Sequence, residues 1–277
     1  MTSALSIETP SGKNKDTENF PVGSFLIRPD LRPHVHCFYA FARAADDIAD
    51  NEILEPSEKL QRLEQFEQTL RSGGNIPVVL HLRESLKETG VSPQHSIDLL
   101  RAFKQDATKL RYKNWDELME YCRYSASPVG RHVLALHGIG QEAWAPNDAL
   151  CSALQVINHI QDCGEDYRAL DRVYLPEDDM AACGAEMFQL GEDQLNPAMR
   201  KVLDMQLQRL RPMIGQARDL PRNVPDFRLK METSIIVTLA ERLLQHLSNC
   251  DVLADNAKLS PLAILGAACT GALRAWG

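Results

Sequence analysis

Two clusters of acidic residues are the part of this chain best suited to do chemistry, and they lie at residues 43–50 and 158–166. Each cluster holds two aspartates four residues apart in a segment whose apolar pattern predicts a helix, so each pair shares one helix face. The pairs are Asp46 with Asp50 and Asp162 with Asp166. Like charges at this spacing weaken a helix, so a cation should offset the repulsion. Paired oxygen ligands suit Mg²⁺, which bridges carboxylates to substrate phosphates, and two facing pairs would bind a diphosphate ester.

The first cluster extends into a stripe that also holds Tyr39 and Arg43, because Tyr39, Arg43, Asp46 and Asp50 follow one another in steps of four, three and four residues. Arg43 can grip a phosphate oxygen with its planar fork. Asp47 lies roughly 100° around the helix from Asp46 and is either a further ligand or a residue behind the ligands. The alternative is an ordinary Arg–Asp pair on a solvated helix. The apolar neighbours of the cluster favour a buried site, in which acids need partners.

The second cluster follows the same logic with amides added. Gln155, Asn158, Asp162 and Asp166 lie along one predicted helix face. An amide followed by two carboxylates fits a metal ion and a phosphate, whereas the alternative is a solvated helix end. Downstream, a short loop with the cation Arg172 and the phenol Tyr174 could close over a diphosphate.

Small residues at 125–130, preceded by Tyr121 and Tyr124, have two interpretations. Such a run usually marks close packing of helices, and it could equally leave space for a long apolar ligand. His34 and His36 are two residues apart and diverge on a helix, so we interpret them as structural.

The composition excludes some classes of function. The net charge of −8 argues against non-specific nucleic-acid binding, and we expect no nucleic-acid partner. The hydrophobic share of 44% and the charged share of 25% are ordinary for a soluble globular protein. The seven cysteines are scattered, with no Cys-x-x-Cys pair, so we expect a reduced protein in the cytoplasm rather than a zinc or disulfide framework.

The hydrophobic periodicity predicts an all-α fold in a single domain, with no alternating strand pattern. Predicted helices cover residues 30–50, 56–71, 76–88, 94–106, 114–125, 127–136, 146–166, 196–220, 226–248 and 259–276, with a loop over 171–179. We expect residues 1–16 to be a flexible N-terminal segment and residues 17–277 to form the domain. The segment from Leu259 to Trp276 is interrupted by Pro261 and Arg274, so it predicts a buried terminal helix, with a membrane-contacting helix as the alternative.

Five stretches strongly resemble the squalene/phytoene synthase family of helical isoprenoid synthases, in the family's order and spacing. They lie at residues 19–22, 38–50, 121–130, 155–166 and 172–176, and the resemblance covers roughly residues 17–250. It implies a single-domain isoprenoid synthase helical bundle around a central cavity.

The resemblance also implies roles for the residues that match. The resemblance implies several Mg²⁺ ions that bridge both acid motifs to diphosphate. The implied ligands of these ions are Asp46, Asp47, Asp50, Asn158, Asp162 and Asp166. The implied substrate-binding residues are Phe20, Arg43, Gln155, Asn158, Arg172 and Tyr174. Tyr39 and Tyr121 would act in catalysis together with Asp46, Asp50, Asp162 and Asp166, and Phe20, Tyr39 and Tyr121 would line the hydrocarbon cavity.

Within the family, residues 18–22, 124–131 and 172–176 most resemble a branch found in bacterial hopanoid pathways. That branch converts presqualene diphosphate and water into hydroxysqualene and diphosphate, and it needs no NADPH because water rather than hydride captures the cation. The family's usual Ser-x-Ser-Phe stretch is here Thr17-Glu18-Asn19-Phe20, which departs where a second prenyl diphosphate is handled.

Two alternatives stay open. One is a condensing synthase that makes presqualene diphosphate or phytoene from two prenyl diphosphates of the farnesyl type. The other is a non-catalytic family member that serves as an assembly or lipid-binding protein. The implied partners are a presqualene diphosphate synthase and a hydroxysqualene reductase acting before and after this protein, with at most peripheral membrane contact.

Overall fold

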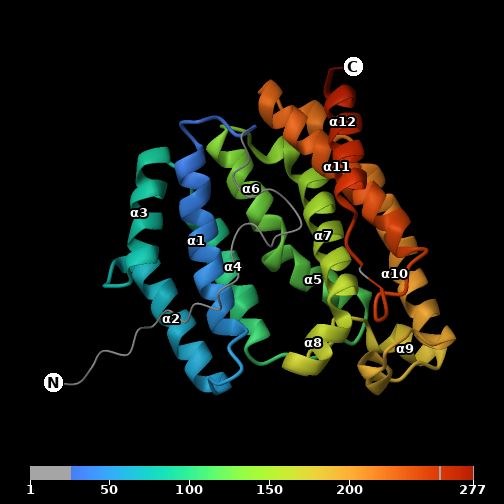
Figure 1. Ribbon diagram of the computed structural model, residues 1–277. Helices are drawn as coiled ribbons and strands as arrows, with labels where there is room; N and C mark the ends of the chain where they lie inside the picture. Colours follow the sequence, from blue (N-terminus) through green and yellow to red (C-terminus); the bar gives the residue numbers. More distant parts are fainter. Residues whose placement is uncertain (1–25, 256, 277) are drawn as a thin grey trace.

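A computed structural model describes residues 26–255 and 257–276 of the chain (Figure 1). The predicted flexible segment 1–16 and the predicted cavity residue Phe20 lie outside the described residues. The described chain is helical, and its α-helices are α1 (Arg32–Ala49), α2 (Pro56–Ser72), α3 (Pro77–Thr89), α4 (Gln94–Asp106), α5 (Trp115–Ser125), α6 (Ser127–Leu136), α7 (Trp144–Gln161), α8 (Cys163–Leu170), α9 (Glu177–Cys183), α10 (Pro197–Ala217), α11 (Phe227–Leu247) and α12 (Pro261–Trp276). Three short 3-10 helices join them, at Gln141–Ala143, Met187–Gly191 and Leu220–Asn223.

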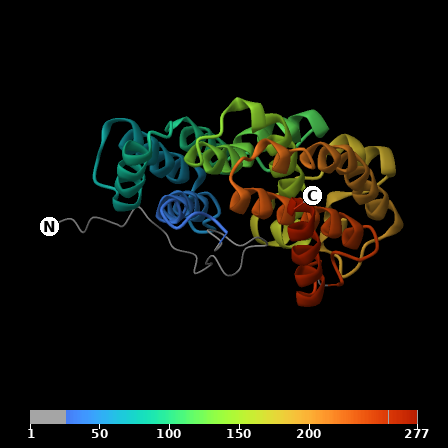
Figure 2. The ribbon, with the colours of Figure 1, turned by 90° about the horizontal axis from the view of Figure 1, so that it is seen from above.

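The helices form two packed groups that meet where α4 contacts α5 and α6. One hydrophobic core lies among α1 to α4, and a larger core lies among α5 to α11. Val133 on α6 packs against both cores, and α4 contacts α5 and α6. Seen from above, α1 runs along the inner side of the first group, facing the helices of the second (Figure 2). The prediction of a single domain over 17–277 stays a prediction.

Helix α1 shows why the sequence folds as it does. Pro33 stands in the first turn, where a missing N–H costs nothing. Phe41, Ala45 and Ile48 are buried and recur at helical spacing, so this face of α1 packs against α2, α3 and α4. The polar residues of the first acid cluster therefore lie on the part of α1 that faces away from this core.

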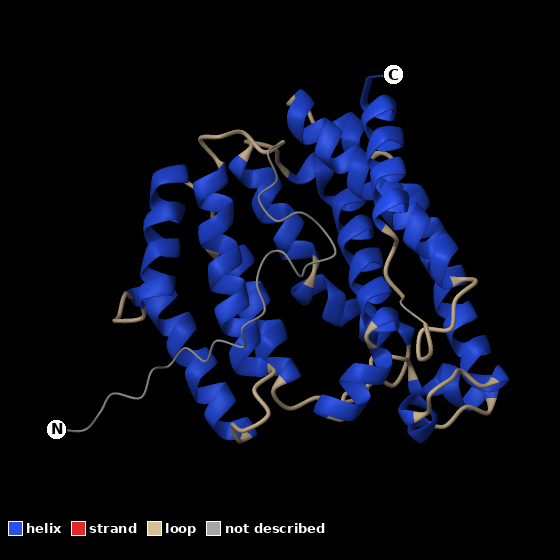
Figure 3. Cartoon of the chain, viewed as in Figure 1, coloured by secondary structure: helices blue, strands red, loops and turns tan. Residues whose placement is uncertain are grey.

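The all-α prediction is confirmed, since the described residues hold no strand and only an isolated bridge between Arg111 and Val173 (Figure 3). Two local predictions are wrong. The helix predicted over 146–166 is two helices that meet at Asp162, where the backbone takes φ −101° and ψ 4°. The loop predicted over 171–179 ends at Pro176, because α9 begins at Glu177.

The prediction that the terminal helix is buried is also wrong. Only Ala267, Gly271 and Ala275 of α12 are buried, and this small-residue face packs on α11. Leu262 and Trp276 remain 81% and 77% exposed. The cause is the size of the packed side chains: a Cβ added to Gly271 would lie 2.5 Å from the Cα of Ile235, so the two backbones touch and the large side chains stand on the other side. Among the described residues, no helix is long and apolar enough to cross a membrane.

Candidate active site

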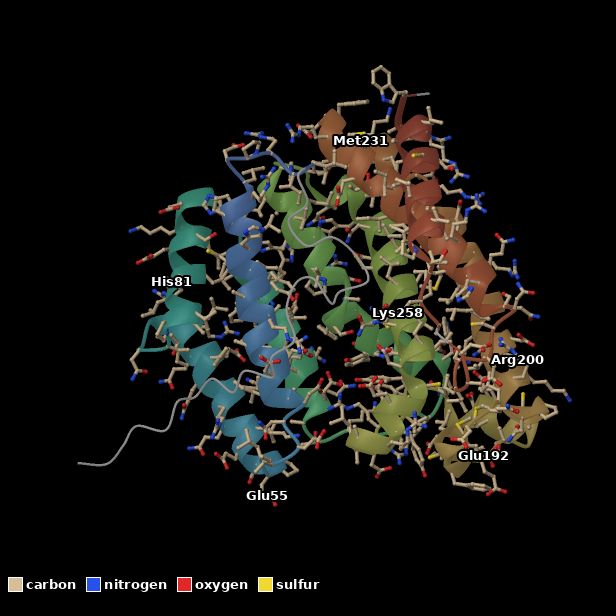
Figure 4. The ribbon with its side chains drawn as sticks, viewed as in Figure 1. Glu55, His81, Glu192, Arg200, Met231 and Lys258 are labelled. Atoms are coloured by element: carbon tan, nitrogen blue, oxygen red, sulfur yellow. The ribbon has the colours of Figure 1, made fainter. Side chains whose placement is uncertain are left out.

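The first acid cluster lies at the C-terminal end of α1, and the second spans the junction between α7 and α8. Asp50 caps the end of α1, and Asp162 caps the end of α7 and begins α8. A helix C-terminus carries a partial negative charge, so Asp50 is repelled by α1 as well as by its neighbouring acids, whereas Asp162 and Asp166 also stand at the N-terminus of α8, where the dipole favours an acid. The last turn of α1 holds no basic residue. Glu55, five residues beyond Asp50, marks this end of the bundle in Figure 4.

The two clusters face each other closely enough to interact. Burial, the adjacent Asp162 and the Asp50 carboxylate of the other cluster raise the pKa of Asp166 from 3.8 to about 7, although Arg172 lowers it. Burial and the neighbouring Asp50 likewise raise the pKa of Asp46, against the influence of Arg43. The carboxylates of the two clusters therefore crowd one another even though Arg172 lies close to both.

Arg172 is the cation that lies between the clusters. Its side chain is buried, and its Nη1 donates to Asp50 Oδ1 at 2.8 Å. Its Nη2 donates to the backbone oxygen of Asp106 at 3.1 Å. The surrounding anions, Asp50 and Asp106 among them, raise the pKa of Arg172 despite its burial. The structure thus brings this predicted residue to the acidic end of the bundle.

Arg43 spans the two inner acids of the first cluster. Its Nη1 lies 3.0 Å from Asp46 Oδ2, and its Nη2 lies 2.9 Å from Asp47 Oδ1. Asp47 is buried and Asp46 is partly exposed. In this arrangement Asp47 orients Arg43. This favours the interpretation in which Asp47 supports the ligand-binding side chains rather than binding a metal ion itself.

A buried cluster centred on Asp106 lies next to Arg172, and the sequence analysis missed it. Tyr121 donates its hydroxyl to Asp106 Oδ2 at 2.8 Å, and Tyr174 donates to Asp106 Oδ1 at 3.2 Å. Burial raises the pKa of Asp106 from 3.8 to about 7, although Arg172 and the two tyrosines lower it. His159 stacks on Tyr174 with ring centroids 3.5 Å apart. Burial lowers the pKa of His159 to about 3, so this histidine adds no positive charge.

Lys59 on α2 is a second residue that the sequence analysis missed. Its Nζ donates to the backbone oxygen of Ala49 at 2.9 Å, on the last residue of α1. A cation at this position offsets the partial negative charge of the helix end. Burial lowers the pKa of Lys59, as does nearby Arg172, whereas Asp50 raises it. No sequence motif marks Asp106 or Lys59, because both residues act through contacts with other segments of the chain.

An apolar cavity of about 260 Å³ runs between α1, α6, α7 and α11. Tyr39 lines it, together with Phe38 and Ala42 of α1. Tyr121 and Tyr174 are not among its lining residues and lie instead in the Asp106 cluster. On α7 the lining runs from Asn147 to Leu154, after which the same helix continues to Gln155, Asn158 and Asp162. Gln155 and Asn158 are partly buried and follow directly on the cavity wall. The cavity and the acid clusters thus occupy successive stretches of the same two helices.

Mg²⁺ fits the donors at this end of the bundle. The carboxylates of Asp46, Asp50, Asp162 and Asp166 and the amide of Asn158 supply only hard oxygen ligands, which Mg²⁺ prefers. Burial and neighbouring acids raise the pKa of Asp46 and of Asp166, and a bound cation would stabilise the ionised form of both carboxyls. Among the described residues, no three His, Cys, Asp or Glu side chains come together closely enough to hold an ion by themselves. This donor set fits ions held jointly by the protein and an anionic ligand.

Comparison with known proteins gives a consistent result. The squalene/phytoene synthase family model matches residues 13–262. The chain is 46% identical over 263 residues to hydroxysqualene synthase of Rhodopseudomonas palustris, which covers 95% of this chain and 89% of that protein. It is 43% identical over 249 residues to hydroxysqualene synthase of Sinorhizobium fredii, with 90% and 85% covered.

Solved structures agree in fold. A squalene synthase crystal structure from Alicyclobacillus acidocaldarius superposes with a TM-score of 0.71 at 30% identity, over 81% of this chain and 85% of that one. A dehydrosqualene synthase superposes with a TM-score of 0.80 at 21% identity, over 93% of this chain and 91% of that one, which speaks for the fold alone.

Proposed function

The chain belongs to the squalene/phytoene synthase family, and on that basis we propose that it is a hydroxysqualene synthase. The proposed reaction converts presqualene diphosphate and water into hydroxysqualene and diphosphate. The observation that carries the proposal is the identity of 42% to 46% with three hydroxysqualene synthases over at least 90% of the chain. The geometry supports it, because an apolar cavity adjoins two facing carboxylate clusters that flank a buried arginine.

In this proposal the acid end of the bundle holds the diphosphate and the cavity holds the hydrocarbon. Asp46, Asp50, Asn158, Asp162 and Asp166 hold Mg²⁺, which when bound supplies Lewis-acid stabilisation of the departing diphosphate. Arg172 lies between the clusters and pairs with Asp50. In the proposed complex its guanidinium exchanges this carboxylate for a phosphate oxygen of the substrate. Asp47 orients Arg43 for the same anion.

The chemical step breaks the carbon–oxygen bond, and both electrons leave with the diphosphate. The resulting cation rearranges and is then captured by water, which forms a new carbon–oxygen bond and releases a proton. Apolar walls keep other water away from the cation, and the face of Tyr39 in the cavity stabilises positive charge. The overall reaction is redox-neutral, so it consumes no NADPH.

The proposal also places the protein between two other activities. Its substrate comes from a reaction that joins two farnesyl-type diphosphates, and its product is an alcohol that a reductase must process to reach squalene. We therefore propose functional coupling to a presqualene diphosphate synthase and a hydroxysqualene reductase. The condensing alternative remains a distinct outcome of the test below.

The test is product analysis by mass spectrometry. Purified protein is incubated with Mg²⁺ and either presqualene diphosphate or farnesyl diphosphate, without NADPH. We expect hydroxysqualene from the former and no reaction of the latter. Presqualene diphosphate or phytoene formed from prenyl diphosphates would establish the condensing alternative instead, and inertness toward every prenyl substrate would leave the non-catalytic alternative.

Matched variants test the site assignment. Asp46→Asn and Asp162→Asn should each abolish most diphosphate release. Asp98→Asn is the control, because Asp98 lies on α4 and accepts a hydrogen bond from Gln94 at 2.7 Å, away from the clusters. Full activity in Asp46→Asn or Asp162→Asn would show that the clusters do not form the active site.

A further inference from the structure

The apolar cavity has one end that lies far from the acid clusters. On α7 the lining residues begin with Asn147 and continue to Leu154. Asn147 stands fifteen residues before Asp162, which is about 22 Å along the helix axis. On α1 the lining begins with Val35, which stands the same number of residues before Asp50. Both helices therefore carry the far end of the cavity at the same distance from their terminal acids.

Polar side chains gather at this far end of the cavity. Asn147 of α7 and Glu232 of α11 both line the cavity and are only 3% and 6% exposed. Glu232 follows Met231, which is labelled at the opposite end of the bundle from Glu55 (Figure 4). An apolar chain that reached beyond this end would press on a buried amide and a buried carboxylate, which is unfavourable because neither can hydrogen-bond to it.

The side chain of Asn147 is fixed in place by hydrogen bonds. Its Nδ2 donates to Asp148 Oδ1 at 3.1 Å and to the backbone oxygen of Ser127 at 3.4 Å. Arg131 of α6 donates from its Nε to the same oxygen of Asp148 at 2.9 Å. The guanidinium of Arg131 in turn lies over the ring of Trp144, with Cζ 4.1 Å from the centroid. Groups from both α6 and α7 thus hold the amide against the cavity.

Gly130 of α6 provides the space that the amide of Asn147 fills. A Cβ added to Gly130 would lie 2.9 Å from Cγ of Asn147 and closer still to its Oδ1. The same Cβ would lie 2.7 Å from Sγ of Cys151. Gly130 also lines the cavity, so the close fit between it and Asn147 lies at the cavity surface. A side chain at either position larger than the present one would have to displace its neighbour.

We propose that Asn147 is a specificity-determining residue, which closes the far end of the cavity and limits the hydrocarbon to chains of the farnesyl type. This inference rests on the proposed function, in which the diphosphate lies at the acid clusters and a chain runs along α1 and α7. One more isoprene unit would require the amide of Asn147 to move away from Ser127 and Asp148. The longer chain is disfavoured because those buried hydrogen bonds would be lost.

The experiment measures binding of farnesyl thiodiphosphate and geranylgeranyl thiodiphosphate by isothermal titration calorimetry with Mg²⁺ present. Each analogue carries a diphosphate and one prenyl chain, and its bridging sulfur resists ionisation, so the measurement does not depend on turnover. The test variants are Asn147→Ala, which opens the end of the cavity, and Asn147→Ser, which opens it while keeping a hydroxyl. The matched control is Leu154→Ala, which enlarges the cavity only eight residues before Asp162. Circular dichroism checks that all four proteins are folded.

We expect the wild type to bind the farnesyl analogue at least about tenfold more tightly than the geranylgeranyl analogue. Asn147→Ala should reduce this preference by at least about tenfold, and Asn147→Ser should reduce it in the same direction. Leu154→Ala should weaken both analogues by the same factor and keep their ratio.

An unchanged ratio in both Asn147 variants would overturn the inference, because a residue that only ties α6 to α7 would weaken both analogues together. An equal change of the ratio in Leu154→Ala would overturn it as well. In either case the proposed function would stand, because product analysis tests it separately. A wild type that binds neither analogue would contradict the placement of diphosphate and chain on which both the proposed function and this inference rest.

Discussion

Replacing the buried Asp106 by asparagine should change how the stability of the protein depends on pH. The folded structure raises the pKa of this carboxyl from 3.8 to about 7, mainly through burial. A raised pKa means that the folded state holds the proton more tightly than the unfolded state. Between about pH 4 and pH 7 the wild type therefore loses stability as pH rises, and above pH 7 the loss from this group is complete.

The size of the effect follows from the shift of about three pKa units. Each unit corresponds to about 1.4 kcal/mol, so ionisation of Asp106 costs the folded state roughly 4 kcal/mol by pH 8. Asparagine fills nearly the same volume and has no charge to bury. Arg172 keeps its bond to the backbone oxygen of residue 106, because that bond does not involve the side chain. The free energy of unfolding of Asp106→Asn minus that of the wild type should therefore rise by about 1.4 kcal/mol per pH unit between pH 4 and 7.

Urea unfolding curves at several pH values between 4 and 8, with a chelator present, measure this difference. Asp98→Asn is the control, since it removes a carboxylate from the same helix but outside the cluster, and its curve should parallel that of the wild type. If the Asp106→Asn and wild-type curves are also parallel, then Asp106 is already ionised at acid pH and burial does not govern the cluster.

Three further predictions concern packing and buried hydrogen bonds. Gly271→Ala should destabilise the protein by about 1–3 kcal/mol, because the new Cβ meets the backbone of α11. Gly266→Ala should stabilise it by about 0.5–1 kcal/mol, because there the new Cβ meets nothing within 4 Å. Melting temperatures of the two variants distinguish these effects. Asp179→Ala should cost about 1–3 kcal/mol in urea unfolding, because it leaves Arg209, bonded to Asp179 at 2.8 Å, without its acid partner. Tyr174→Phe should cost about 1 kcal/mol and slow diphosphate release, since it removes one of the two hydroxyls that hold Asp106; unchanged release would separate that cluster from catalysis.

The positions of the acid clusters could be predicted because they depend on local spacing. Asp46 and Asp50 lie four residues apart on α1 as the pattern required, and the helix boundaries of α1 differ from the prediction by two residues or fewer at each end. The break at Asp162 could not be predicted in the same way. The backbone bonds from Asp162 to Asn158 and from Asp166 to Asp162 both persist, at 2.9 and 2.8 Å, so the local pattern of α7 continues into α8. Helix α8 also packs through a long-range contact that no local pattern contains, since a Cβ added to Gly164 would lie 2.7 Å from Cδ2 of Leu253.

The Asp106 cluster and the exposed face of α12 were missed for two different reasons. Asp106 ends an ordinary amphipathic helix, and its role depends on residues that lie 15, 66 and 68 positions away along the chain. No local pattern contains that information. In α12 the apolar residues surround the whole helix, so hydrophobicity alone does not say which face is packed. The spacing of Ala267, Gly271 and Ala275 at four-residue steps was the available signal, because small residues allow two helix backbones to approach closely.

Helices α1 and α7 each connect the two parts of the candidate site. On α1, Tyr39 lines the cavity and Asp50 ends the helix eleven residues later, a distance of about 16 Å along the axis. On α7 the cavity wall likewise precedes Asn158 and Asp162. Under the proposed function, a helix that carries both cavity wall and acids fixes how far the hydrocarbon would lie from the diphosphate. Under the proposed function, substitutions in the cavity wall should therefore alter which prenyl chain reaches the acids correctly, even at wall positions remote from the acid clusters.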